Sequence, residues 1–253
     1  MLLVHGLSSN ARLWDEVAAW LAEDGHPVVA IDLRGHGSSA QVPDPTDGPG
    51  ATLVAAADLA EVCIGLGWRS PIVVGQSWGG NVVLQLAVNH PELVHGLALV
   101  DGGWLHLGDR WPTLDAAWTD LAPLAFDGLT ADDVRGRLAS AHPDWSEAAV
   151  EATLANLRVR ADGTVTPWLE RGRHRRIVES MLGHRPRDLY PRVRCRTLLL
   201  AALAPGDDAI DARRLLDEAV AALPHAELVE FPGADHDLHA QHPERVAKLI
   251  GTL

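Results

Sequence analysis

Residues 73–83, VVGQSWGGNVV, decide the fold of this chain. The apolar run that leads into this stretch is rich in β-branched residues and predicts a buried strand. Apolar residues at helical spacing follow at once and end near His90-Pro91, because proline cannot continue a helix. Between strand and helix lies Gly-x-Ser-x-Gly, whose glycines leave room that a side chain would fill. We therefore expect Ser77 at the tip of a strained turn, at the positive end of a helix dipole.

Strands and helices alternate on both sides of this turn. The other continuous apolar runs, which we interpret as strands, are residues 2–4, 28–31, 96–100, 197–203 and 227–231. Helical patterns outside the middle of the chain cover 10–22, with Asn10 as the cap, 51–66, 209–223 and 243–253. Such alternation predicts right-handed crossovers and a parallel sheet. Ligands bind such sheets at the carboxyl ends of the strands, where Ser77 and Asp101 both fall.

These motifs resemble those of the α/β-hydrolase family, in its serine-nucleophile branch, and the resemblance covers nearly all of the chain. It implies the α/β class: a mostly parallel, doubly wound sheet of eight strands with a helical cap insertion. The hydrolase core is expected at residues 1–103 and 192–253, and the cap at 104–191. The family usually has two strands before the one at residues 2–4. Either the start of the chain is trimmed or mis-assigned, or the sheet lacks these edge strands.

The resemblance also implies roles for single residues. Ser77 corresponds to the nucleophile, and His236, in the loop after the last strand, to the general base. The backbone N–H groups of Leu7, in the loop after the first strand, and of Trp78 correspond to the oxyanion hole. Together they describe a site for attack on a carbonyl group.

The acid of the triad has two candidate positions. Asp101 directly follows the strand at 96–100, a site used in some branches of the family, although an Asp there can also be a structural turn residue. The usual family site follows the strand at 197–203, where Asp207 and Asp208 come later than expected. We favour Asp101 and keep Asp207 as the alternative acid.

The alternation stops between residues 104 and 191, where helical patterns cover 131–141, 146–157 and 171–182. Most of the tryptophans in this segment are expected to pack its core. Trp104, just past a strand end, is the candidate to line an apolar substrate pocket. The basic cluster Arg171–Arg176 fits either a solvated helix face or a clamp for an anionic substrate group.

Composition limits the kind of partner. A net charge of −13 over 253 residues argues against nucleic acid and anionic membrane surfaces. Cys63 and Cys195 lie in apolar contexts and are expected to be buried thiols. The first residues lack the pattern of a signal peptide, which makes the cytoplasm the default compartment. We expect no metal at the evenly spaced histidines of residues 236–242, because the chain lacks a metalloprotease-type motif.

The sequence thus predicts a cofactor-free serine hydrolase that cleaves an ester, a lactone or a related acyl compound through an acyl-enzyme. Serine at the turn, in place of aspartate, argues against the haloalkane dehalogenase and epoxide hydrolase branches. The same triad also serves carbon–carbon bond hydrolysis and cofactor-free haloperoxidation. A ligand receptor with little turnover is the alternative from another class.

Overall fold

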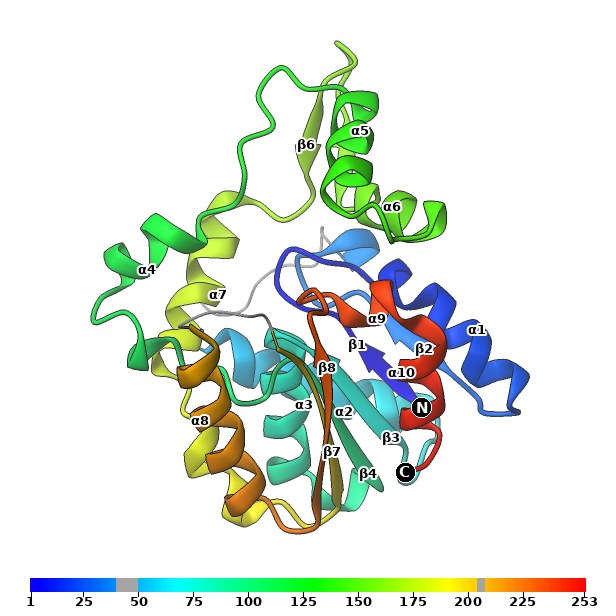
Figure 1. The fold of residues 1–253 in the computed structure, drawn as a ribbon, viewed down its shortest axis with the longest axis vertical. Helices are drawn as coiled ribbons and strands as arrows, with labels where there is room; N and C mark the ends of the chain where they lie inside the picture. The colour runs from blue at the N-terminus through cyan, green and yellow to red at the C-terminus, as the bar shows by residue number, and fades with distance from the viewer. Residues whose placement is uncertain (40–49, 204–207) are drawn as a thin grey trace.

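The computed structural model describes residues 1–39, 50–203 and 208–253. One parallel sheet lies at its centre, with the strand order β2-β1-β3-β4-β7-β8 (Figure 1). Its strands are β1 (Leu2–Val4), β2 (Val29–Ile31), β3 (Ile72–Gln76), β4 (Gly96–Val100), β7 (Arg196–Leu203) and β8 (Ala226–Pro232). The predicted parallel, doubly wound sheet is confirmed. The described residues form six strands of it and not the eight that the resemblance implied, since Leu2 already belongs to β1 and β2 is the outermost strand on that side.

Helices cover both faces of the sheet (Figure 1). On one face lie α2 (Ala51–Gly65), α3 (Trp78–Asn89) and α8 (Asp208–Ala222), and on the other α1 (Asp15–Glu23) and α10 (Pro243–Ile250). Strand β1 shows why two layers form: Leu2 and Val4 pack into the core on the α2–α3 side, and Leu3 into the core on the α1–α10 side. Side chains alternate between the faces of a strand, so an apolar strand needs cover on both.

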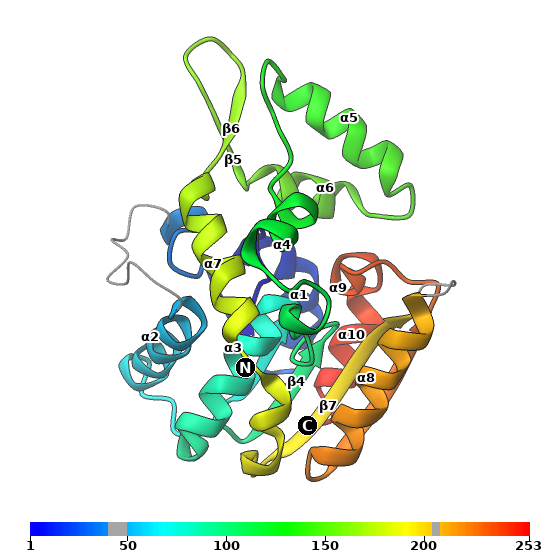
Figure 2. The same ribbon diagram turned by 90° about the vertical axis from the view of Figure 1, so that its left-hand side faces the viewer.

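The segment between β4 and β7 rises above the carboxyl end of the sheet (Figures 1 and 2). It contains α4 (Leu114–Leu121), α5 (Ala131–Ala141), α6 (Glu147–Leu154), α7 (Arg171–Gly183) and an antiparallel hairpin of β5 (Leu157–Val159) and β6 (Val165–Pro167). The predicted helices at α5, α6 and α7 are present. The helix predicted at 146–157 is too long at its C-terminal end. Leu157 continues the helical spacing of Leu154, but it is the first residue of β5.

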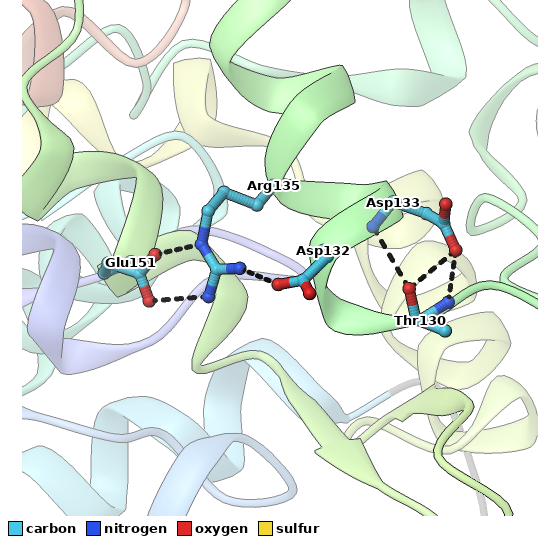
Figure 3. A network of polar contacts seen from close by, with 5 residues as sticks. All are labelled: Thr130, Asp132, Asp133, Arg135 and Glu151. Atoms are coloured by element: carbon cyan, nitrogen blue, oxygen red, sulfur yellow. Dashed lines mark hydrogen bonds and ion pairs between the residues drawn. The ribbon is translucent and has the colours of Figure 1, made fainter.

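Polar contacts fix the start of α5 and join it to α6 (Figure 3). Thr130 and Asp133 form a capping box, in which the Thr130 N–H donates to the Asp133 carboxylate at 2.8 Å. Arg135 donates to Glu151 of α6 at 2.5 Å and also pairs with Asp132. These side chains are well exposed, so each ion pair contributes at most about 1 kcal/mol.

Both ends of the inserted segment are tied to α3 through Asn81, which is fully buried one turn past Ser77. Its Nδ2 donates to the carbonyl of Leu105 at 2.7 Å, and its Oδ1 accepts the N–H of Gly103 at 3.1 Å. Nδ2 also lies 3.3 Å from Nδ1 of His184, near the far end of the segment. The segment is therefore anchored on the helix that begins at the predicted nucleophile.

No helix in the described ranges is both long and apolar enough to cross a membrane. Both cysteines are free, with Cys63 buried and Cys195 partly so. Burial raises the pKa of each thiol, in keeping with unreactive packing residues.

Candidate active site

The strand–turn–helix predicted around Ser77 is present. Ser77 joins β3 to α3 with φ 52° and ψ −123°, a backbone conformation that non-glycine residues seldom adopt. Its N–H donates to the carbonyl of Val100 on β4 at 3.0 Å. A Cβ at Gly75 would lie 2.2 Å from the carbonyl oxygen of Gly79, and one at Gly79 would lie 2.4 Å from that of His5. The motif glycines are therefore required by close backbone approach.

Asp101 and His236 are brought into contact at the carboxyl end of the sheet. Oδ2 of Asp101 accepts a hydrogen bond from Nδ1 of His236 at 2.5 Å. Oδ1 of Asp101 accepts the N–H of Ala202 at 3.0 Å, and its own N–H donates to the carbonyl of Leu200 at 2.7 Å. The carboxylate is thus held by β7 and directed at the histidine. A proton on Nδ1 leaves Nε2 of His236 as the free acceptor nitrogen.

The alternative acid, Asp207, lies outside the described residues. Asp208 begins α8, and its side chain lies outside the described part of the structure. Among the side chains that are described, Asp101 supplies the carboxylate bonded to His236.

The charges around His236 favour its protonated form. Burial of the ring lowers its pKa, but the hydrogen bond and negative charge of Asp101, with the charge of Asp237, outweigh this and raise the pKa above its ordinary value. About half of the side chain, 51%, is exposed, so a ligand can approach the ring. Gln76, which precedes Ser77, donates from Nε2 to the carbonyl of His236 at 3.3 Å. This bond ties the histidine loop to the turn that carries Ser77.

Leu7 and Trp78, the predicted oxyanion-hole residues, both come from segments next to Ser77. Trp78 is the first residue of α3, and Leu7 follows Gly6, where a Cβ would lie 2.9 Å from Cβ of Ser77. No acceptor within residues 1–39, 50–203 and 208–253 takes the N–H of Leu7 or that of Trp78. Unpaired donors beside a serine are what a developing oxyanion requires.

The neighbouring histidines serve the structure. Nε2 of His5 accepts the N–H of Leu33 at 2.9 Å, and Nδ1 donates to the carbonyl of Gly6 at 2.7 Å. Burial lowers the pKa of His5 to about 4, which keeps the ring neutral. His239 is fully buried against Trp14, with ring centroids 4.3 Å apart, and burial lowers its pKa to about 3. In the described part of the chain, no group of three histidine, cysteine or acidic side chains is placed to hold a metal ion.

A cavity of about 590 Å³ lies between the core and the inserted segment. Its lining includes Ser8, directly after Leu7, and His142, whose Nδ1 lies 2.8 Å from the carboxylate of Asp235, directly before His236. The cavity is thus lined by a chain neighbour of Leu7 and by a side chain bonded to the residue before His236, although Ser77 and His236 are not part of its lining. Its walls are mostly apolar, with Leu121, Phe126, Val134, Leu138, Trp168 and Leu169 among them.

The inserted segment departs from expectation at two places. Trp104, the candidate pocket residue, is 7% exposed within the larger core cluster and is not part of the cavity lining, because it packs under the segment where the chain leaves β4. Among the arginines of the basic cluster, Arg175 pairs with Asp115 at 2.5 Å, and Arg171 and Arg175 both lie over the ring of Trp118. None of these arginines lines the described cavity, so an anion clamp in it finds no support. Of the basic cluster, His174 does line the cavity.

The sequence model of the alpha/beta hydrolase family matches residues 1–249. A putative non-heme haloperoxidase of Mycobacterium phage D29 is 34% identical over 101 residues, which are 40% of this chain and 35% of that protein. Esterase Rv0045c of Mycobacterium tuberculosis is 39% identical over 101 residues, 40% of this chain and 32% of the esterase. The match therefore spans about a third of these relatives.

Among solved structures, E-2-(acetamidomethylene)succinate hydrolase shares the fold. The TM-score is 0.75 at 23% sequence identity, and the superposition covers 100% of this chain and 90% of that one.

Proposed function

The chain belongs to the alpha/beta hydrolase family, and we propose that it is a serine hydrolase of an ester, a lactone or a related acyl compound. The observation that carries this proposal is the 2.5 Å contact of Asp101 with His236, on the loop that Gln76 ties to the Ser77 turn. The esterase name of one relative is in keeping with it.

Each residue has a defined part in the proposed reaction. His236 Nε2 takes the hydroxyl proton of Ser77 as the serine oxygen attacks the carbonyl carbon. Asp101 fixes the Nδ1–H tautomer and stabilises the imidazolium that forms. The N–H groups of Leu7 and Trp78 bind the oxyanion, and removal of one such donor typically costs about 2.7–4 kcal/mol.

The proton then passes from His236 to the leaving alkoxide, and the acyl group stays on Ser77. Water attacks this acyl-enzyme while His236 takes one of its protons. His236 then returns this proton to the oxygen of Ser77 as the bond to the acyl group breaks, which releases the acid product and restores Ser77 and neutral His236. No other reactant is consumed, so the sum of the two steps is the hydrolysis of one acyl bond.

The proposal places the rest of the substrate in the cavity described above. We assign residues 104–191 as a cap on a core of 1–103 and 192–253, with the cavity between them as the binding site for an apolar part of the substrate. A volume of about 590 Å³ falls within the usual range for small-molecule pockets. The mainly apolar lining favours a hydrocarbon or aromatic group over a charged one.

Cofactor-free haloperoxidation is a second candidate, because a relative carries the name of a putative non-heme haloperoxidase. It would use the same Ser77, His236 and Asp101. Halogenation of a dye in the presence of halide and peroxide, compared with ester turnover by the same preparation, separates the two activities.

Turnover of p-nitrophenyl esters of increasing chain length tests the proposal, together with labelling by a fluorophosphonate probe. The wild type is expected to hydrolyse at least one ester and to be labelled at Ser77, as read by peptide mass spectrometry. Ser77→Ala should lose both properties and keep its fold. Ser140→Ala is the matched control, since Ser140 lies on α5 and donates to the carbonyl of Gly136 on the same helix. Labelling that persists in Ser77→Ala would overturn the assignment.

A further inference from the structure

A buried histidine of the inserted segment is bonded to the turn that carries Leu7. His174, on α7, is 4% exposed. Its Nε2 lies 2.9 Å from the carbonyl oxygen of Leu121, and its Nδ1 lies 3.0 Å from Oγ of Ser8. A carbonyl oxygen only accepts, so Nε2 carries the proton and Nδ1 accepts the hydroxyl hydrogen of Ser8. Burial lowers the pKa of His174, which keeps this neutral form in place.

Ser8 occupies a backbone conformation that needs support. The N–H of Ser9 donates to the carbonyl of Gly6 at 3.3 Å, which closes a turn of residues 6–9. Ser8 is the third residue of this turn, with φ 62°, as in type II turns, where that position prefers glycine. A serine held there is strained, and such strain persists only where the surroundings fix it. The bond from its hydroxyl to His174 is a contact that does so.

The same turn sets the direction of the N–H of Leu7. We propose that His174 is a positioning residue: by holding Ser8, it fixes the turn of residues 6–9 and so aims the N–H of Leu7 at the oxyanion. This inference rests on the proposed function, in which Leu7 is an oxyanion donor. Oxyanion donors act only when held close to their required position, so a small shift of the turn is costly.

Two residues of the inserted segment hold the ring of His174 in place. Leu121, at the end of α4, accepts from Nε2, and Trp118 of the same helix meets the ring edge-on at a centroid distance of 5.5 Å. The segment therefore takes part in oxyanion stabilisation as well as in enclosing the cavity. His174 also lines that cavity, so the same side chain borders the cavity and holds the turn of residues 6–9.

The test uses two amide variants of His174. The side-chain amide of asparagine lies where Nδ1 lies in histidine, so its oxygen can accept the hydroxyl hydrogen of Ser8. The longer side chain of glutamine places its amide where Nε2 lies, so its NH₂ group can donate to the carbonyl of Leu121, but the contact with Ser8 is lost. His174→Asn is expected to keep kcat within about threefold of wild type. His174→Gln is expected to lower kcat about tenfold or more, which is less than the ~10²–10³ lost when an oxyanion donor is removed. In His174→Gln the fall in kcat should exceed any change in KM, because the lost contact with the turn acts in the transition state, and a change in KM alone would reflect only the place of His174 in the cavity lining.

Ser8→Gly supplies the matched background. Glycine adopts the positive φ of residue 8 without support, so His174→Gln should lose most of its effect in the Ser8→Gly protein. Inhibition by a trifluoromethyl ketone, which forms an oxyanion with the serine, should weaken in parallel with kcat in His174→Gln and recover in the double variant. The unfolding midpoint of each variant identifies a loss caused by misfolding alone.

The outcomes separate this inference from the proposed function. If the wild type hydrolyses esters and is labelled at Ser77 but His174→Gln matches it in kcat, the positioning role is wrong. The same holds if His174→Gln is equally impaired in the wild-type and in the Ser8→Gly background, because the defect then does not pass through the turn. A wild type that neither turns over esters nor is labelled at Ser77 overturns the proposed function, and this inference with it.

Discussion

Nδ1 of His236 lies 2.5 Å from Oδ2 of Asp101, although 135 positions separate the two residues in the chain. The parallel pairing of β4 and β7 allows this contact. Asp101 directly follows the end of β4, and its carboxylate accepts the N–H of Ala202 on β7. His236 follows β8, the next strand of the sheet. Asp101 is therefore placed at the carboxyl edge of the sheet between the strand of the nucleophile and that of the histidine.

Asp101→Asn should abolish most of the hydrolytic activity. An asparagine amide in place of the carboxylate favours the wrong tautomer of His236, and the equivalent change in another serine enzyme lowers kcat by about 10⁴. Asp207→Asn and Asp208→Asn, measured on the same ester, should change kcat by less than about threefold. Loss of activity in Asp207→Asn with normal turnover in Asp101→Asn would contradict the assignment.

The pH dependence of kcat/KM should report the ionisation of His236. The general base must be neutral, so activity rises with pH through the pKa of His236 and is lost on the acid side. Because Asp101 and Asp237 raise this pKa, the midpoint should lie above the ordinary value of about 6.5. Removal of the Asp101 charge in Asp101→Asn should shift the midpoint of the residual activity to lower pH. A profile without an acid limb would exclude His236 as the base.

Filling the cavity should change the chain-length preference. Leu138→Trp adds bulk at the cavity wall and is expected to lower kcat/KM for long-chain p-nitrophenyl esters about tenfold or more, while acetate hydrolysis stays within about twofold. Leu53→Trp, at a 52% exposed position of α2, is the control and should leave the whole series unchanged. An unchanged ratio of long-chain to acetate turnover in Leu138→Trp would mean that the substrate lies elsewhere.

Asn81→Ala should destabilise the protein by about 2–3 kcal/mol, because it leaves the buried Gly103 N–H and Leu105 carbonyl without partners. Urea denaturation measures the loss. The control is Asn89→Ala, on the same helix but exposed, where the loss of the Gln85 contact should cost less than about 1 kcal/mol. Equal stability of Asn81→Ala and wild type would show that the segment does not depend on this anchor.

The turn at Ser77 could be predicted because its signals are local. Strand period, helix period and the two glycines all act within a dozen neighbouring residues, and the structure has the strand, the turn and the helix where these patterns put them. Helix α5 begins and ends at its predicted residues. Its start depends on a capping box of Thr130 and Asp133, two residues that are close together in the sequence. The three-residue strands β5 and β6 were missed, because so short a strand depends on its partner and Leu157 continues a helical spacing.

By itself, therefore, the sequence determined the fold class, the order of the strands and helices of the core, and the residues at the strand ends where the candidate site lies. Only the tertiary structure showed that the Asp101 carboxylate contacts His236, that Trp104 packs in the core, and that Ser8 and His174, 166 positions apart, share a hydrogen bond. Periodicity and turn chemistry record the backbone conformation of neighbouring residues. Contacts between distant side chains depend on sheet register and helix packing, which no single stretch of sequence encodes.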